Sequence, residues 1–198
     1  MGQEATPTRQ PYTGSCHCGA VKYILYLTLP HDPPPASQRR NPDGSMRQIF
    51  YRCNCTTCHK AGLLHIRLPH PPDDFLLLAP LDPLGELGDY QCFRKAAHFL
   101  FCKTCGVRCF TIVGEGELVE KVVGESGEKR TVWCPKKGWV ESPTNYFSVN
   151  GYTLDAGQEG LDLRDWTEKK WLMYADCLQD RPPELSWTYD RPFPGGAY

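Results

Sequence analysis

The sequence has no long hydrophobic run. No uninterrupted apolar stretch approaches the roughly 20 residues that a bilayer-spanning helix needs. The opening residues, MGQEATPTRQ, are polar and lack the apolar segment of a secretory signal. Gly2 and Thr6 fit the N-myristoylation pattern, which is short and occurs often by chance. We therefore predict a cytoplasmic protein with no membrane partner.

An excess of charge of either sign is also lacking. The 198 residues include 22 Lys and Arg against 23 Asp and Glu, for a net charge of −1. Such a balance provides no extended positive surface for nucleic acid or an anionic membrane. We predict a small-molecule substrate as the partner and no nucleic acid, and the composition indicates no particular oligomeric state.

Long helices are not expected either. Eighteen prolines and 18 glycines predict many turns and irregular connections. Apolar residues alternate at Val21, Tyr23 and Leu25, which is typical of a strand. We predict a mainly β fold with little helix, with strands at Ala20–Leu29, Ile49–Arg52, Gly62–Leu68, Phe75–Leu78, Leu118–Val123, Arg130–Trp133 and Tyr146–Tyr152, and a hairpin within 96–113.

The chain reads as one domain. Residues 1–11 are predicted to be a disordered lead-in, followed by a single domain over 12–198. Within it, we expect a core over 12–113 and an elaborated part over 114–198.

Three other segments are predicted not to be strands. Residues 30–45 carry five prolines and end in Asp-Gly-Ser, which predicts a solvated surface loop. The segment 161–178 is the best candidate for a helix. The tail over 181–198 contains four prolines, but its aromatic residues indicate that it packs onto the domain.

Eleven cysteines need an explanation. In a reducing compartment, clustered cysteines bind metal or do chemistry more often than they form disulfides, and an odd count argues against a fully paired framework. Seven lie in three short groups: Cys16 and Cys18; Cys53, Cys55 and Cys58; and Cys102 and Cys105. A C-x-x-C turn followed by glycine suits zinc, because its backbone can point both sulfurs at one ion.

Seven cysteines cannot form two groups of four. The natural division gives Cys53, Cys55 and Cys58 one zinc ion and leaves the two remaining pairs to hold a second. Three protein ligands with a vacancy are typical of a catalytic ion, whereas four thiolates are typical of a structural one. Spacing alone permits other pairings, and the second ion can instead be a structural one completed by His59, Cys92, Cys109 or another side chain.

Three strings carry a resemblance: G-S-C-H-C-G-A-V from Gly14, C-N-C-T-T-C-H-K-A-G from Cys53, and F-C-K-T-C-G from Phe101. Together they resemble the glutathione-dependent formaldehyde-activating enzyme family, also known by its centromere protein V member. The likeness covers about residues 12–113. It implies a β-tent of antiparallel sheets with two zinc ions, a structural one on Cys16, Cys18, Cys102 and Cys105 and a catalytic one on Cys53, Cys55 and Cys58. The activity it implies is that of a carbon–sulfur lyase acting on glutathione.

The leading hypothesis is therefore zinc-dependent chemistry on glutathione or a related thiol adduct of an aldehyde. An open position on zinc can bind a thiol and lower its pKa from about 8.5. Cations near the cysteines could hold an acidic substrate: Arg52, Lys60, Lys103 and Arg108. His59 and His65 are candidate proton carriers, although each of these side chains is individually more often a surface or packing residue.

Two alternatives stay open. A zinc-dependent lyase, isomerase or hydrolase could act on a larger metabolite, for which an aromatic content of 12% suits a wider pocket. A non-enzymatic, zinc-stapled interaction module is the other; it would have four protein ligands on the second ion and no adjoining pocket.

Overall fold

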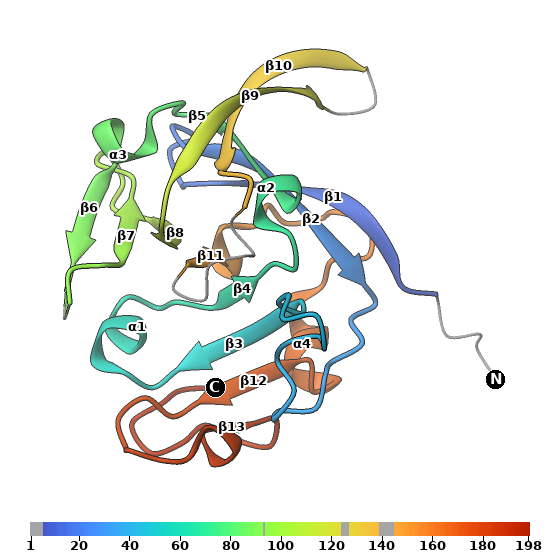
Figure 1. The fold of residues 1–198 in the computed structure, drawn as a ribbon, viewed down its shortest axis with the longest axis vertical. Helices are drawn as coiled ribbons and strands as arrows, with labels where there is room; N and C mark the ends of the chain where they lie inside the picture. Colours follow the sequence, from blue (N-terminus) through green and yellow to red (C-terminus); the bar gives the residue numbers. More distant parts are fainter. Residues whose placement is uncertain (1–5, 93, 124–126, 139–144) are drawn as a thin grey trace.

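The computed structural model describes residues 6–92, 94–123, 127–138 and 145–198 (Figure 1). Residues 1–5 of the predicted lead-in, with Gly2 among them, lie outside this range. The strands are β1 (Thr8–Ser15), β2 (Lys22–Leu29), β3 (Ile49–Cys53), β4 (His65–Arg67), β5 (Phe75–Ala79), β6 (Gly88–Gln91), β7 (His98–Phe101), β8 (Arg108–Val113), β9 (Gly116–Val123), β10 (Glu128–Pro135), β11 (Tyr146–Asn150), β12 (Leu172–Ala175) and β13 (Trp187–Thr188). The helices are α1 (Thr56–Lys60), α2 (Pro71–Asp74), α3 (Pro83–Glu86) and α4 (Leu163–Glu168), with 3₁₀ turns η2 (Gly151–Thr153) and η3 (Pro183–Leu185).

The strands form two sheets. One has the order β1-β2-β5-β10-β9 and is antiparallel throughout. The other has the order β13-β12-β3-β4-β11-β8-β7-β6, in which β12 and β3 are parallel and the other pairs antiparallel. The prediction of a mainly β fold of antiparallel sheets with little helix is thus confirmed. Among the described residues, no helix is long and apolar enough to cross a membrane.

The main core lies between the two sheets. Phe75 of β5 packs against Phe110 of β8 and Phe147 of β11, with ring centroids 5.3 and 4.7 Å apart. These aromatic side chains are almost fully buried, together with Tyr23 and Leu25 of β2. Burying such large apolar surfaces from both sheets stabilises their packing.

The predicted disordered lead-in is wrong from Thr8 onward. Strand β1 begins at Thr8, which pairs with Leu29, and continues in register to Ser15 opposite Lys22. The sequence TRQP looks polar because this part of β1 is mostly exposed at the edge of its sheet. Backbone pairing with β2, rather than apolar burial, orders this stretch.

The predicted helix over 161–178 is correct only for its first part. Helix α4 ends at Glu168, and Lys170 has a positive φ of 55°, which breaks the helix. The next residues form β12, which is buried throughout and runs parallel to β3. A strand buried on both faces is continuously apolar, and such a run cannot be told from a helix by periodicity alone.

The predicted solvated loop over 30–45 is more ordered than expected. His31, Pro34 and Ser45 are buried. A bridge joins Arg40 to Met46, and the Tyr189 hydroxyl donates to the Pro34 carbonyl at 2.6 Å. The loop therefore packs against the tail, as the aromatic residues of the tail indicated.

Candidate metal centres

The first cysteine group joins two turns that are far apart in the chain. Cys16 and Cys18 follow β1, while Cys102 and Cys105 lie between β7 and β8. Each turn contains a glycine with positive φ, Gly19 at 76° and Gly106 at 74°. Because L side chains rarely adopt this conformation, glycine lets each turn curl so that its sulfurs face the other pair.

The four sulfurs of this group all lie within 4.8 Å of one another. The Sγ atoms of Cys16 and Cys18 are 3.5 Å apart, as are those of Cys18 and Cys102. Tetrahedral zinc with sulfurs at about 2.3 Å places them a similar distance apart. The backbone N–H groups of Val107 and Cys18 donate to Cys105 and lower its pKa to about 6, which favours the thiolate that a metal needs.

The second group comes from one short segment. Cys53 ends β3, Cys55 is the N-cap of α1, and Cys58 lies in its first turn. Their three sulfurs lie within 4.8 Å of one another, and the Cys58 N–H donates to the Cys55 sulfur at 3.5 Å. A strand end followed by a helix start therefore gathers three ligands within six residues.

The chemistry of this donor set fits zinc. Donation from the Cys53 and Cys58 thiols, and then from the backbone N–H of Cys58, holds the pKa of Cys55 well below its ordinary range. One anionic sulfur with two further thiols beside it is a site that a zinc ion could occupy by displacing protons. Both groups are thus compatible with metal, and the division into four and three sulfurs is the predicted one.

A small open pocket adjoins the second group. Its volume is about 70 Å³, and both Cys53 and Cys58 line it. The other lining residues come from β3, α1, the connection after α1, η2 and the tail: Arg52, His59, Gly62, Leu63, Tyr152 and Ala197. A ligand in this pocket would therefore contact two of the three candidate zinc ligands.

Among the predicted cations, Arg52 lies at the pocket and the others do not. Its Nη2 donates to the Tyr152 hydroxyl, while its buried Nε has no partner among the described residues. Lys60 is exposed on α1 and does not line the pocket. Lys103 donates to Gly85 near the first group, and Arg108 lies over the rings of Tyr90 and Phe101.

The two candidate histidines have different surroundings. His59 is exposed and lines the pocket. His65 is buried, with its Nε2 3.2 Å from the Cys58 sulfur and its Nδ1 2.9 Å from the Ser148 hydroxyl. Burial lowers the pKa of His65 to about 4, so its imidazole is neutral at pH 7. In the tautomer that satisfies both contacts, Ser148 donates to Nδ1 and Nε2 donates to sulfur.

Three further cysteines are members of neither group. Cys109 and Cys134 are buried in the core, and burial raises the pKa of both thiols. Cys92 contacts the Thr57 hydroxyl at 3.6 Å. None of the three belongs to a metal-competent group of described residues, so Cys109 and Cys92 do not complete the second site in this structure.

Cys177 is a neighbour of the second site that the sequence did not indicate. The Cys53 and Cys177 sulfurs lie within hydrogen-bonding reach of each other, and this contact lowers the pKa of Cys177. Cys177 is exposed and is not within the three-sulfur group. It reaches this position because Ala175 of β12 pairs with Cys53 of β3, a parallel contact that local patterns do not predict.

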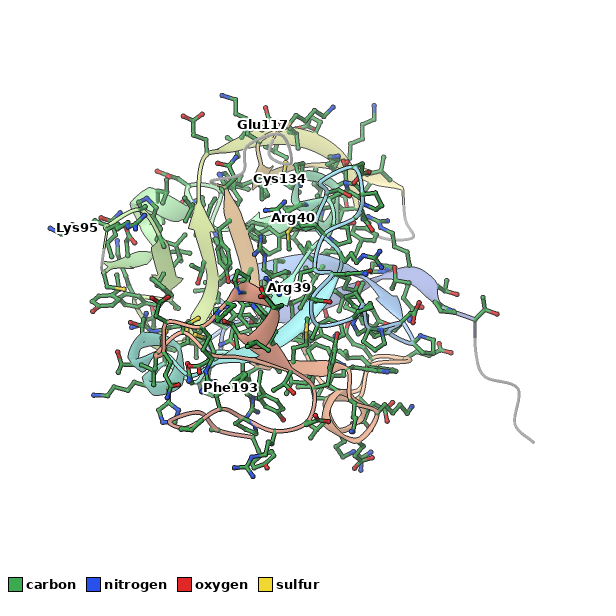
Figure 2. The ribbon with its side chains drawn as sticks, turned by 60° about the horizontal axis from the view of Figure 1, so that its bottom comes forward. Arg39, Arg40, Lys95, Glu117, Cys134 and Phe193 are labelled. Carbon is green, nitrogen blue, oxygen red and sulfur yellow. The ribbon has the colours of Figure 1, made fainter. Side chains whose placement is uncertain are left out.

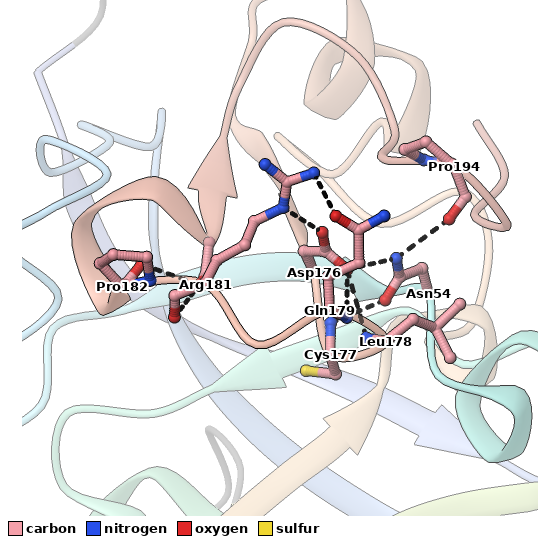
Figure 3. A network of polar contacts seen from close by, with 9 residues as sticks. Asn54, Asp176, Cys177, Leu178, Gln179, Arg181, Pro182 and Pro194 are labelled. Atoms are coloured by element: carbon pink, nitrogen blue, oxygen red, sulfur yellow. Dashed lines mark hydrogen bonds and ion pairs between the residues drawn. The ribbon is translucent and has the colours of Figure 1, made fainter.

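Asn54 lies between two cysteines of the second group, and its side chain forms hydrogen bonds with the segment after β12 and with the tail (Figure 3). Its side-chain oxygen accepts from the Cys177 N–H at 2.7 Å, and its side-chain nitrogen donates to the buried Asp176 at 2.8 Å and to the Pro194 carbonyl at 3.1 Å. Arg181 pairs with the same carboxylate at 2.7 Å. The network holds the end of β12 and the tail against the metal-binding segment.

Comparison with known proteins adds little to this geometry. No protein-family model matches the chain. A crystal structure of a Rhodobacter sphaeroides protein is similar with a TM-score of 0.39 and 20% identity, over 77% of this chain and 93% of that one. A likeness at this level defines neither the fold nor the function of this chain.

Proposed function

We propose that the protein is a zinc-dependent enzyme of the carbon–sulfur lyase type, acting on glutathione or a related thiol adduct of an aldehyde. Zinc on Cys53, Cys55 and Cys58 would be the reactive ion, and zinc on the first group a structural one. The resemblance to the glutathione-dependent formaldehyde-activating enzymes supports the reaction class. One observation carries the proposal: the second group supplies three sulfurs where the first supplies four, and two of its cysteines line a pocket.

The residues around the pocket suit a small anionic thiol. Arg52 lines the pocket, and the guanidinium N–H groups that Tyr152 does not use would bind a carboxylate of the substrate. Leu63 and the ring of Tyr152 give the pocket an apolar side. The part of the substrate that would lie against the sulfurs is its small carbon centre, which a volume of about 70 Å³ accommodates.

Zinc at this site would supply a position for the substrate sulfur and lower the pKa of that thiol. In the cleavage direction the carbon–sulfur bond of a hydroxymethyl thioether breaks, the carbinol O–H becomes the carbonyl of formaldehyde, and its proton moves to the leaving sulfur. The exposed imidazole of His59 lines the pocket and is the group proposed to carry that proton. Neither an oxidant nor a reductant is needed.

His65 would act through Cys58 rather than on the substrate. Its N–H at 3.2 Å withdraws charge from the Cys58 sulfur. Three thiolates blunt the Lewis acidity of zinc, and such a hydrogen bond reduces that effect. We therefore assign His65 as a positioning residue.

The test is exchange spectroscopy on the zinc-loaded protein with formaldehyde and a thiol. Glutathione and 2-mercaptoethanol form similar adducts, but only glutathione carries carboxylates. We expect catalysed exchange with both thiols, and we expect Arg52→Gln to raise KM about tenfold for glutathione while leaving KM for mercaptoethanol unchanged.

Two results would separate the parts of this proposal. Two bound zinc ions without catalysed exchange would leave the metal centres standing and refute the reaction class. An equal effect of Arg52→Gln on both thiols would refute the role of Arg52 in binding a carboxylate.

A further inference from the structure

A second concave surface lies away from the pocket of the candidate zinc site. Its volume is about 510 Å³, and it is formed by the loop after β2, strand β4 and strand β13. Its lining includes three arginines, Arg39, Arg40 and Arg67, and the aromatic residue Trp187. Arg39 and Arg40 lie close together on the face turned toward the viewer in Figure 2.

The three guanidinium groups have no acidic partner within the described part of the chain. None of them takes part in an ion pair. Burial, and then the charges of Arg67 and Arg40, lower the pKa of Arg39. The nearby carboxylate of Asp43 instead accepts from the N–H and hydroxyl of Ser45. Like charges gathered without a counter-charge destabilise a fold, and a bound anion would offset that cost.

Aromatic rings hold two of these arginines in place. The Arg39 guanidinium lies 4.5 Å from the Trp187 ring centroid, and that of Arg67 lies 4.5 Å from the Tyr146 ring centroid. Such cation–π contacts orient the guanidinium planes before any ligand arrives. Binding would then cost less side-chain entropy than at flexible surface cations.

The loop over 37–46, which carries Arg39 and Arg40, is held in its conformation by hydrogen bonds. The Arg47 N–H donates to the Arg39 carbonyl at 3.1 Å, and the Asn41 N–H donates to the Ser45 carbonyl at 2.8 Å. Arg39 and Arg40 each donate one side-chain N–H to a loop carbonyl, at 2.9 and 2.8 Å. A guanidinium carries several more donors than this one bond uses, and these remain for a ligand.

We propose that this pocket binds a small molecule through a multiply charged oxyanion, either a phosphate group or clustered carboxylates. Arginine matches both kinds of oxyanion with paired N–H donors. The site requires no metal, so it stands or falls independently of the proposed enzyme activity. A series of aromatic contacts nevertheless links the pocket to the second cysteine group. The ring centroids of Trp187 and Tyr51 are 5.0 Å apart, and those of Tyr51 and His65 are 4.6 Å apart.

The test is isothermal titration calorimetry with inorganic pyrophosphate in one arm and citrate in the other, using the full chain with its metals bound. We expect saturable binding of at least one anion, which weakens as ionic strength rises. Arg39→Gln, Arg40→Gln and Arg67→Gln should each lower the affinity about tenfold. Arg130→Gln is the matched control, because Arg130 is an exposed arginine paired with Glu128 on β10.

The two arms identify the oxyanion, since binding of only one anion assigns the site to phosphate or to carboxylate chemistry. Thermal melts must show that the three arginine variants fold, so that a lower affinity can be assigned to the site. A second variant, Trp187→Phe, keeps a ring beside Arg39, and we expect it to bind the anion more weakly than the parent does. Saturable heat for neither anion would overturn the proposal. A loss in Arg130→Gln as large as in the pocket variants would overturn it too, since that pattern reflects general surface charge.

Discussion

The two cysteine groups differ in how far apart their members lie in the sequence. Cys16 and Cys18 meet Cys102 and Cys105 across more than eighty residues, from turns at the ends of different sheets. Cys53, Cys55 and Cys58 come from one strand end and one helix start. A metal on the first group would cross-link the fold, whereas one on the second would constrain only a local turn. Long-range ligation thus indicates a structural role, and local ligation beside a pocket leaves a site free for chemistry.

The largest expected effect is on the first group. Cys102→Ala should cost about 4 kcal/mol or more in the free energy of unfolding, since a ligand of a fold-spanning metal is lost. Thermal and denaturant unfolding with metal analysis measure this. Cys109→Ala, a buried neighbour outside both groups, is the control and should cost about 1 kcal/mol. Similar losses in both variants would mean that the first group is ordinary core.

The second group should show the reverse pattern. Cys55→Ala should remove one of two bound metal ions and lower thiol exchange more than about a hundredfold, because a direct ligand matters more than its supporting contacts. The melting temperature should change little, since no distant segment is released. Metal content, exchange rate and a melt on the same sample check this. A variant that simply unfolds would erase the proposed difference between the groups.

A smaller effect should follow from the hydrogen bond to Cys58. His65→Phe keeps a ring against Tyr51 but removes the N–H, and should weaken metal affinity at the second group by about 10–100-fold. Competition with a chelator gives the affinity of each ion. The control is His31→Phe, another buried histidine beside a ring, Phe50, but without a sulfur contact. Equal weakening in both variants would point to packing instead.

A further effect concerns the pH dependence of stability at His31. Burial lowers the pKa of His31 from 6.5 to about 4, so the unfolded chain binds a proton more readily than the folded one between these values. Its contribution to stability is therefore present above pH 6.5 and is lost as pH falls toward 4. His31→Phe should gain stability relative to the parent over that window in urea unfolding. An unchanged difference from pH 7 to pH 4.5 would show that His31 does not titrate this way.

Local spacing was sufficient to predict the three cysteine turns. Alternation was sufficient for β2, and short apolar runs bounded by turn residues were sufficient for β5 and the β9–β10 hairpin. These features depend on residues close in sequence, which is where patterns are informative. The proximity of Cys177 to Cys53 depends on the parallel pairing of β12 with β3, and the contact of His65 with Cys58 depends on where β4 lies. Both follow from tertiary pairing, and β12 was missed because its apolar run begins only three residues after α4 ends.

The central claim is that the two ions have different ligands, and zinc-edge X-ray absorption tests it most directly. We predict two zinc ions per chain, one with sulfur ligands only and one with three sulfurs and a lighter fourth ligand, in the parent and in Cys177→Ser alike. The account would be contradicted if both ions had only sulfur ligands in the parent and one sulfur were lost in Cys177→Ser. Cys177 would then fill the coordination position that we assign to the substrate.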